Sequence, residues 1–139
     1  MTDFIDTSVL VAAAVDSEAF HGECDALLER PALGMYAHGI AETFSTLTGG
    51  RKGFRMSAQI VAEVIETDYI PFLTITALSP TEVLRAMRDA ESRGVRGGGI
   101  FDYLHLVAAR KAKAARFYTL NVAHFRACHR AGDPEIVHP

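Results

Sequence analysis

Cysteine is scarce in this chain, and tryptophan is absent from it. The two cysteines, Cys24 and Cys128, lie in apolar segments, and neither has a CxxC partner. A disulfide framework or a zinc site needs more ligands at closer spacing. We therefore expect both cysteines to be buried free thiols of a protein that works in a reducing compartment.

The chain also lacks an excess of positive charge and any long hydrophobic run. Its 14 Lys and Arg residues stand against 17 Asp and Glu residues, for a net charge of -3. This balance excludes a general basic surface for a nucleic-acid backbone and confines any such contact to a local patch. No apolar run approaches the ~18 residues of a membrane span, and the chain opens without the basic segment of a secretory signal. We expect a cytoplasmic protein without membrane contact.

What is present is the pattern of one compact α/β domain. With 139 residues, 49% of them apolar, the chain can bury a single core, so residues 1–139 form one predicted domain. Short continuous apolar runs alternate with stretches of helical periodicity, which favours a three-layer sandwich with a central, mostly parallel sheet flanked by helices. The predicted strands are 4–6, 35–37, 72–78, 116–121 and 135–139, with 72–78 in the sheet interior.

Three local signals refine the predicted helices. Ser17 is placed to cap the second helix, and Ile40, Phe44 and Leu47 mark the buried face of the helix that starts near residue 38. The stretch "SPTE" at 79–82 combines a serine cap, a proline at the first helical position and a glutamate that closes a capping box. It predicts a helix start directly after the third strand.

Asp6 is an unusual charge at the end of the first apolar run. In parallel α/β sheets the ligand site lies beyond the carboxyl ends of the strands, which makes Asp6 a candidate site residue. The alternative is that Asp6 only caps the following helix, although Thr7 and Ser8 are equally able to cap it.

Two more carboxylates fall near predicted helix starts. Glu42 lies off the centre of the buried face of its helix, where a solvated role is the simpler reading. Asp102 follows three glycines in the first turn of its helix, where the helix dipole favours an anion. A parallel sheet tends to bring such ends to one edge, and clustered carboxylates repel unless a cation joins them. Oxygen ligands suit Mg²⁺ or Mn²⁺.

These residues resemble a known family. "DTSVL" from Asp6, Glu42 in its helix, "GGGIFDYLHLVAA" around Asp102 and "YTLNVAHF" together are similar to a PIN domain of the VapC-type ribonuclease toxins. The resemblance spans almost the whole chain. It implies a Mg²⁺- or Mn²⁺-dependent endoribonuclease, the toxin of a toxin–antitoxin pair, that cleaves RNA phosphodiesters with a metal-activated water. It also implies a homodimer and a cognate antitoxin. Asp6, Glu42 and Asp102 match the family's catalytic and metal-binding acids, and Ser8 matches the hydroxyl residue beside the first acid.

The fourth acidic position departs from the family pattern. Many members carry aspartate where this chain has Asn121, and the later acidic position of the same segment is His124. An amide can bind an ion through its oxygen but adds no negative charge, so the number of ions, one or two, stays open. Asp133 in the C-terminal loop is an alternative source of the missing charge.

Substrate contacts are predicted from hydroxyl and basic residues. Ser8 and Thr119 flank the acidic residues, and "GGRKGFR" places Arg51 and Lys52 beside Phe54 in a small loop suited to RNA phosphates. A solvated loop is the alternative reading. The six histidines form no HExxH-like pair, so we assign them to the surface or the core.

Two other functions stay open at this point. One is a PIN-like module that binds RNA or protein with little or no cleavage, because the acidic set is incomplete. The other is an aspartyl-phosphate phosphotransferase of the haloacid dehalogenase type with Asp6 as nucleophile, although such enzymes need a second acid where this chain has Ser8.

Overall fold

The computed structural model describes residues 2–53 and 55–139, whose strands form one parallel sheet with the order β3-β2-β1-β4-β5. The strands are β1 (Asp3–Ile5), β2 (Leu33–Tyr36), β3 (Leu73–Thr76), β4 (Arg116–Tyr118) and β5 (Glu135–Val137). The helices are α1 (Thr7–Ala14), α2 (His21–Leu27), α3 (His38–Gly49), α4 (Ala58–Val64), α5 (Pro80–Asp89), α6 (Gly99–Lys111) and α7 (Val122–Cys128). Shorter helical turns occur at Ile65–Tyr69, Ile70–Phe72 and Glu91–Arg93.

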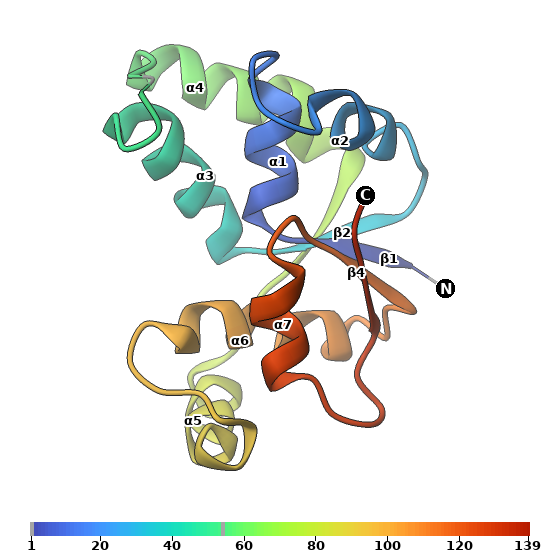
Figure 1. The fold of residues 1–139 in the computed structure, drawn as a ribbon. Coiled ribbons are helices and arrows are strands. Elements are labelled where there is room, and N and C mark those ends of the chain that lie inside the picture. Colours follow the sequence, from blue (N-terminus) through green and yellow to red (C-terminus); the bar gives the residue numbers. More distant parts are fainter. Residues whose placement is uncertain (1, 54) are drawn as a thin grey trace.

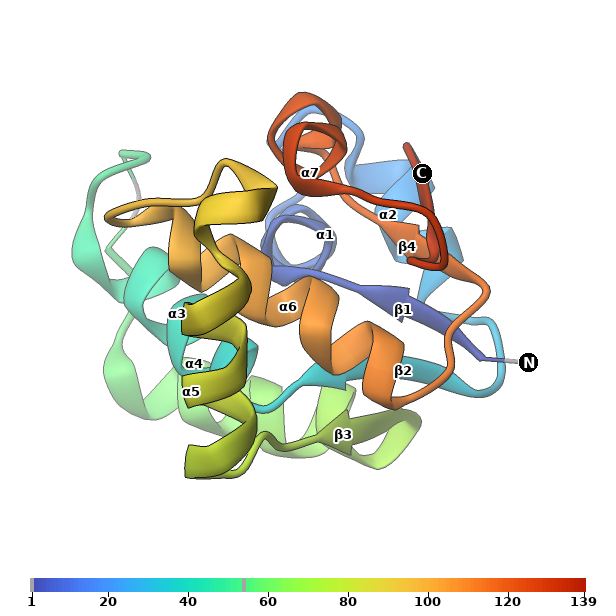
Figure 2. The same cartoon turned by 90° about the horizontal axis from the view of Figure 1, so that it is seen from below.

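Helices cover both faces of the sheet. Helices α1 to α4 lie on one face and α5 to α7 on the other, as Figures 1 and 2 show from two directions. All four strand pairings are parallel. The predicted three-layer α/β sandwich is thereby confirmed.

The central strand β1 supplies side chains to both sides of the sheet. Phe4 packs in the cluster formed with α5, α6 and α7, whereas its neighbour Ile5 packs against α1 and α2. Gly34 on β2 makes room for this arrangement, because a Cβ there would lie 2.7 Å from the Phe4 ring. Because neighbouring residues of β1 are buried on opposite faces of the sheet, the strand must be apolar at successive positions.

Several local predictions are confirmed. Ser79 caps α5 by accepting a hydrogen bond from the Glu82 backbone N–H, and the Glu82 carboxylate accepts one in return from the Ser79 backbone N–H. Cys24 and Cys128 are buried free thiols, and burial raises the pKa of Cys24 to about 11. Within the two described ranges, no helix has both the length and the apolarity to cross a membrane.

Other local predictions are wrong. The second helix begins at His21, four residues after the predicted cap Ser17. Strand β3 is shorter than predicted and lies at an edge of the sheet rather than in its interior, so none of its residues is fully buried and Thr74 is exposed. On α3, Thr43 is fully buried while Phe44 is 37% exposed. The Thr43 hydroxyl satisfies its donor within the helix, on the Gly39 carbonyl, which lets a polar side chain take an inner position.

Candidate active site

The site lies where the order of the strands reverses. The chain continues from β1 to β2 on one side and returns to β4 on the other side of β1, so the segments after β1 and β4 leave a crevice at their carboxyl ends. A pocket of about 300 Å³ opens there. It gathers most of the predicted site residues, namely Asp6, Ser8, Glu42, Lys52, Asp102 and Asn121, together with Thr7, Val11, Thr46, His105 and Leu120.

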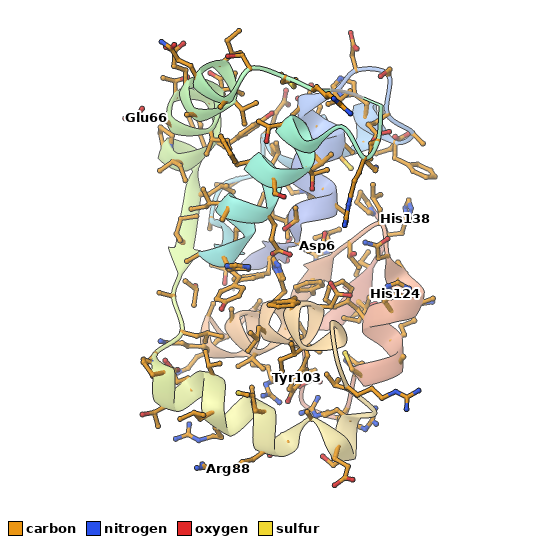
Figure 3. All side chains as sticks on the ribbon, turned by 90° about the vertical axis from the view of Figure 1, so that its left-hand side faces the viewer. Asp6, Glu66, Arg88, Tyr103, His124 and His138 are labelled. Atoms are coloured by element: carbon orange, nitrogen blue, oxygen red, sulfur yellow. The ribbon has the colours of Figure 1, made fainter. Side chains whose placement is uncertain are left out.

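Asp6 lies at the bottom of this pocket, near the centre of the molecule between α3 and α6 (Figure 3). Only 4% of the residue is exposed. Its Oδ1 accepts a hydrogen bond from the Ser8 hydroxyl at 2.5 Å and its Oδ2 accepts one from the Thr119 hydroxyl at 2.8 Å. Burial raises the pKa of Asp6, and these two hydrogen bonds and the charge of His105 only partly offset that rise. The carboxylate is therefore rigidly held and short of positive charge.

The two hydroxyls that hold Asp6 are themselves fixed by the backbone after β4. The Leu120 N–H donates to Ser8 Oγ at 3.0 Å, and the Asn121 N–H donates to Thr119 Oγ1 at 2.9 Å. Thr119 has no exposed surface. The prediction that Thr119 contacts substrate is wrong in this arrangement, because its hydroxyl points inward and orients Asp6.

Glu42 enters the pocket from α3 and meets a histidine that the sequence analysis did not single out. Its Oε1 lies 2.6 Å from His105 Nε2 and accepts a second hydrogen bond from the Thr7 hydroxyl at 3.3 Å. Burial alone would raise the pKa of Glu42, but the hydrogen bond and charge of His105, with smaller contributions from His38 and Thr7, lower it instead. Position 105 is three residues after Asp102, on the same face of α6, and this spacing is the signal that was available.

Asp102 enters from the first turn of α6, after the glycine-rich loop. Gly97 has a positive φ of 54°, which a residue with a side chain rarely adopts, and it turns the chain into the helix. The side chain of Asp102 is 43% exposed, and its Oδ2 lies 3.8 Å from His124 Nδ1. Burial raises the pKa of Asp102, and Glu42 adds to that rise, while the charges of His105 and His124 oppose it.

Two basic residues of the loop after α3 line different pockets. Lys52 lines the pocket and forms an ion pair with Glu18 at 2.5 Å. Arg51 instead lines a neighbouring hollow of about 450 Å³, which shares Glu42 with the first. Phe54, predicted to be exposed beside them, lies outside the described residues.

The two candidates for the fourth acidic position differ in location. Asn121 is exposed and lines the pocket. Asp133 is not part of the pocket lining, because its side chain, 1% exposed, is bound between Arg93 and Arg110. Asp133 thus neutralises two arginines, and the idea that it supplies the missing charge of the site is wrong.

The donor set fits a hard divalent cation in kind. Asp6, Glu42 and Asp102 line one pocket, and burial raises the pKa of Asp6 and of Asp102, so that a cation there would stabilise their ionised forms. In the part of the chain that the structure describes, no three His, Cys, Asp or Glu side chains are gathered closely enough to hold an ion. Of the three acids Asp102 is the one with freedom to approach the others, because its side chain is 43% exposed whereas Asp6 and Glu42 are held by hydrogen bonds.

Solved structures with the same fold include one bacterial toxin and two VapBC proteins. VapC20 of Mycobacterium tuberculosis, a toxin that cleaves the sarcin–ricin loop, superposes with a TM-score of 0.71 at 18% identity, covering 96% of this chain and 100% of that one. VapBC2 of Rickettsia felis, bound to a DNA fragment of its promoter, superposes with a TM-score of 0.68 at 15% identity, covering 100% of this chain and 99% of that one. VapBC-1 of nontypeable Haemophilus influenzae superposes with a TM-score of 0.60 at 17% identity, covering 99% of this chain and 98% of that one.

These likenesses show the fold. By sequence, no curated protein matches the chain. The family model of the PIN domain matches residues 4–129, a range that holds all three carboxylates of the pocket and both hydroxyls that bind Asp6. With nearly its whole length matched, this chain belongs to the PIN domain family.

Proposed function

We propose that the protein is a divalent-metal-dependent endoribonuclease and the toxin of a toxin–antitoxin pair. The observation that carries this proposal is that Asp6, Glu42 and Asp102, from three separate segments, line one open pocket at the switch point of the sheet. Carboxylates that repel one another in a half-buried pocket form a site for Mg²⁺ or Mn²⁺. PIN family membership and the likeness to VapC structures support the same activity.

In this proposal the three acids have distinct tasks. Asp6 and Asp102 would hold the cation, and Glu42 would complete its shell or orient the attacking water. A bound Mg²⁺ or Mn²⁺ supplies a lowered pKa for that water and neutralises charge on the phosphodiester. Ser8 and Thr119 keep both oxygens of Asp6 in place, so that no reorganisation of this carboxylate is needed when RNA arrives.

The proposed partners are a cognate antitoxin, a second copy of the chain and RNA in the cytoplasm. The VapBC2 and VapBC-1 structures are toxin–antitoxin complexes with the same fold, which supports an antitoxin here. The phosphotransferase alternative is disfavoured because the second acid that such an enzyme needs two residues after its nucleophile is Ser8 here, and the Ser8 hydroxyl donates a hydrogen bond to Asp6.

Metal-dependent cleavage of a mixed RNA pool tests the proposed function. The purified chain is incubated with total RNA at pH 7.5 in Mg²⁺, in Mn²⁺ or in excess EDTA, with single-stranded DNA of matched length as the control substrate. We expect discrete RNA fragments in the two metal buffers and intact RNA in EDTA. Uncut RNA in every buffer, with binding to RNA or protein retained, would instead support the non-cleaving module.

Lys52 is expected to contribute to RNA binding rather than to the chemical step. Its ammonium lines the pocket and pairs with Glu18, a partner that an RNA phosphate can replace. Lys52→Ala should raise KM about five- to tenfold with kcat within about twofold, because one phosphate contact is lost. Steady-state cleavage of a short RNA at two salt concentrations measures this. Lys113→Ala is the matched control, because Lys113 is exposed and lies two residues after the end of α6, away from the pocket lining. An equal rise in KM there would refute a local role.

The wild-type protein, with Asn121, is expected to bind a metal ion more weakly than a variant with aspartate at this position. With three carboxylates in the pocket rather than four, the site carries one less negative charge. Asn121→Asp should therefore tighten Mn²⁺ binding, while added repulsion lowers the stability of the metal-free protein. Isothermal titration of both proteins with Mn²⁺ measures the change. Equal affinities would place residue 121 outside the metal shell.

A further inference from the structure

We infer that His105 is a positioning residue that holds Glu42 by a hydrogen bond from Nε2–H, leaving the second carboxylate oxygen of Glu42 for the proposed cation. The part of this inference that concerns the cation rests on the proposed function, whereas the hydrogen bond between His105 and Glu42 does not. The hydrogen bond itself joins two residues whose ring and carboxylate atoms approach to 2.6 Å across the interface of α3 and α6. Neither PIN family membership nor the fold likeness assigns a role to this histidine.

The ring of His105 has little freedom to move. The residue is 2% exposed, and its ring meets that of Tyr36 edge-on at a centroid distance of 5.3 Å. Helix α3 also approaches the ring closely at a glycine, Gly39, where a Cβ would lie 3.1 Å from His105 Cε1 and 2.4 Å from Met35 Cε. A fixed imidazole imposes its direction on the more mobile glutamate, because Glu42 is part-exposed and has three rotatable bonds.

The surroundings of the ring also indicate which nitrogen carries the proton. Nδ1 is buried and has no hydrogen-bond partner among the described residues. A buried N–H without an acceptor is rarer and more costly than a bare ring nitrogen without a donor. A neutral His105 therefore carries its proton on Nε2, and a protonated ring, the form whose charge lowers the pKa of Glu42, carries one there as well, so that Nε2–H donates to Glu42 in either state.

This contact divides the two oxygens of Glu42 between two tasks. Oε1 accepts hydrogen bonds from both His105 and Thr7. Oε2 accepts none from a described side chain, and it is the oxygen left for the cation. A second partner that orients a ligand in this way typically changes metal affinity or activity by about 10–100-fold when it is removed.

Two substitutions separate the donated proton from the bulk of the ring. His105→Gln places an amide N–H close to the position of Nε2, whereas His105→Leu fills the cavity without a donor. We expect His105→Leu to raise the Kd for Mn²⁺ by about 10–100-fold and His105→Gln to stay within about threefold of the wild type. Isothermal titration gives the affinities, and thermal unfolding without metal shows that both variants fold. Equal Kd values for all three proteins, or equal losses in both variants, would overturn the inference.

A second readout needs neither metal nor RNA. Long-range ¹H–¹⁵N spectra of the metal-free protein at pH 8 report the tautomer of each histidine, with His105→Gln identifying the signal. We expect His105 in the Nε2–H form, and an Nδ1–H form would overturn the hydrogen bond. If the wild type binds no divalent ion and cuts no RNA while His105 is in the Nε2–H form, the proposed function fails and the pairing with Glu42 stands.

Discussion

Asp6→Asn is expected to abolish RNA cleavage and, at the same time, to make the metal-free protein more stable. The substitution removes a charge from the proposed metal shell, and the loss of a metal ligand should reduce the rate by at least about 10³-fold. Stability should rise because the wild-type carboxylate is buried with two neutral hydroxyl partners and a raised pKa. Asparagine keeps the shape of the side chain without the cost of a buried charge.

The pH dependence of this gain follows from the direction of the pKa shift. A carboxyl group whose pKa is higher in the folded than in the unfolded protein binds its proton more tightly when folded. The wild type therefore loses stability as pH rises from the unfolded value of ~3.9 through the raised folded value. The advantage of Asp6→Asn should be full above that window and should vanish below it.

Thermal unfolding in EDTA at several pH values, paired with cleavage assays in Mn²⁺, checks both effects. For a chain of this length, 1 kcal/mol corresponds to roughly 3–5 °C in Tm. Asp16→Asn, on an exposed loop, is the matched control and should change neither quantity. Wild-type cleavage by Asp6→Asn would mean that Asp6 has no metal role and serves only at the start of α1, where asparagine and aspartate cap about equally well.

Asp133→Asn is expected to produce the largest loss of stability among the substitutions considered. Asp133 lies between Arg93 and Arg110, and its Oδ2 also accepts a hydrogen bond from the Arg130 backbone N–H. Arg93 is itself mostly buried, against the ring of Tyr103. Removing one partner of a buried ion pair leaves the other charge uncompensated, at a cost of about 3–5 kcal/mol. Tm should fall by roughly 10–25 °C.

Asp3→Asn is the matched control, because Asp3 also accepts hydrogen bonds from two arginines. Its partners Arg30 and Arg116 have side chains that are nearly half exposed, so water can replace the lost carboxylate. Urea unfolding of the two variants should show a far smaller loss for Asp3→Asn. Similar losses would mean that the environment of Asp133 is not the cause. Cleavage by Asp133→Asn should stay near the wild-type rate below its Tm, since Asp133 is not part of the pocket lining.

The sequence by itself determined the architecture and the acids that line the pocket. Strands and helices alternate with distinct periodicities. Asp6 follows β1 and Asp102 lies in the first turn of α6, the helix that leads back to the start of the parallel strand β4, so both were predictable members of one crevice. The start of α5 was equally predictable, because a capping box is made by residues three positions apart. Such features depend on local spacing, which a sequence displays directly.

Only the tertiary structure decided which side chains complete the site. His105 and Glu42 are 63 residues apart, and Thr119 reaches Asp6 across 113 residues, so neither contact leaves a local pattern. The same holds for the ion pair of Asp133 with Arg93, which are 40 residues apart along the chain. The edge position of β3 likewise follows from the order of strands in the sheet. These contacts arise because packing brings distant segments together, and the energy of each contact depends on the burial that packing creates.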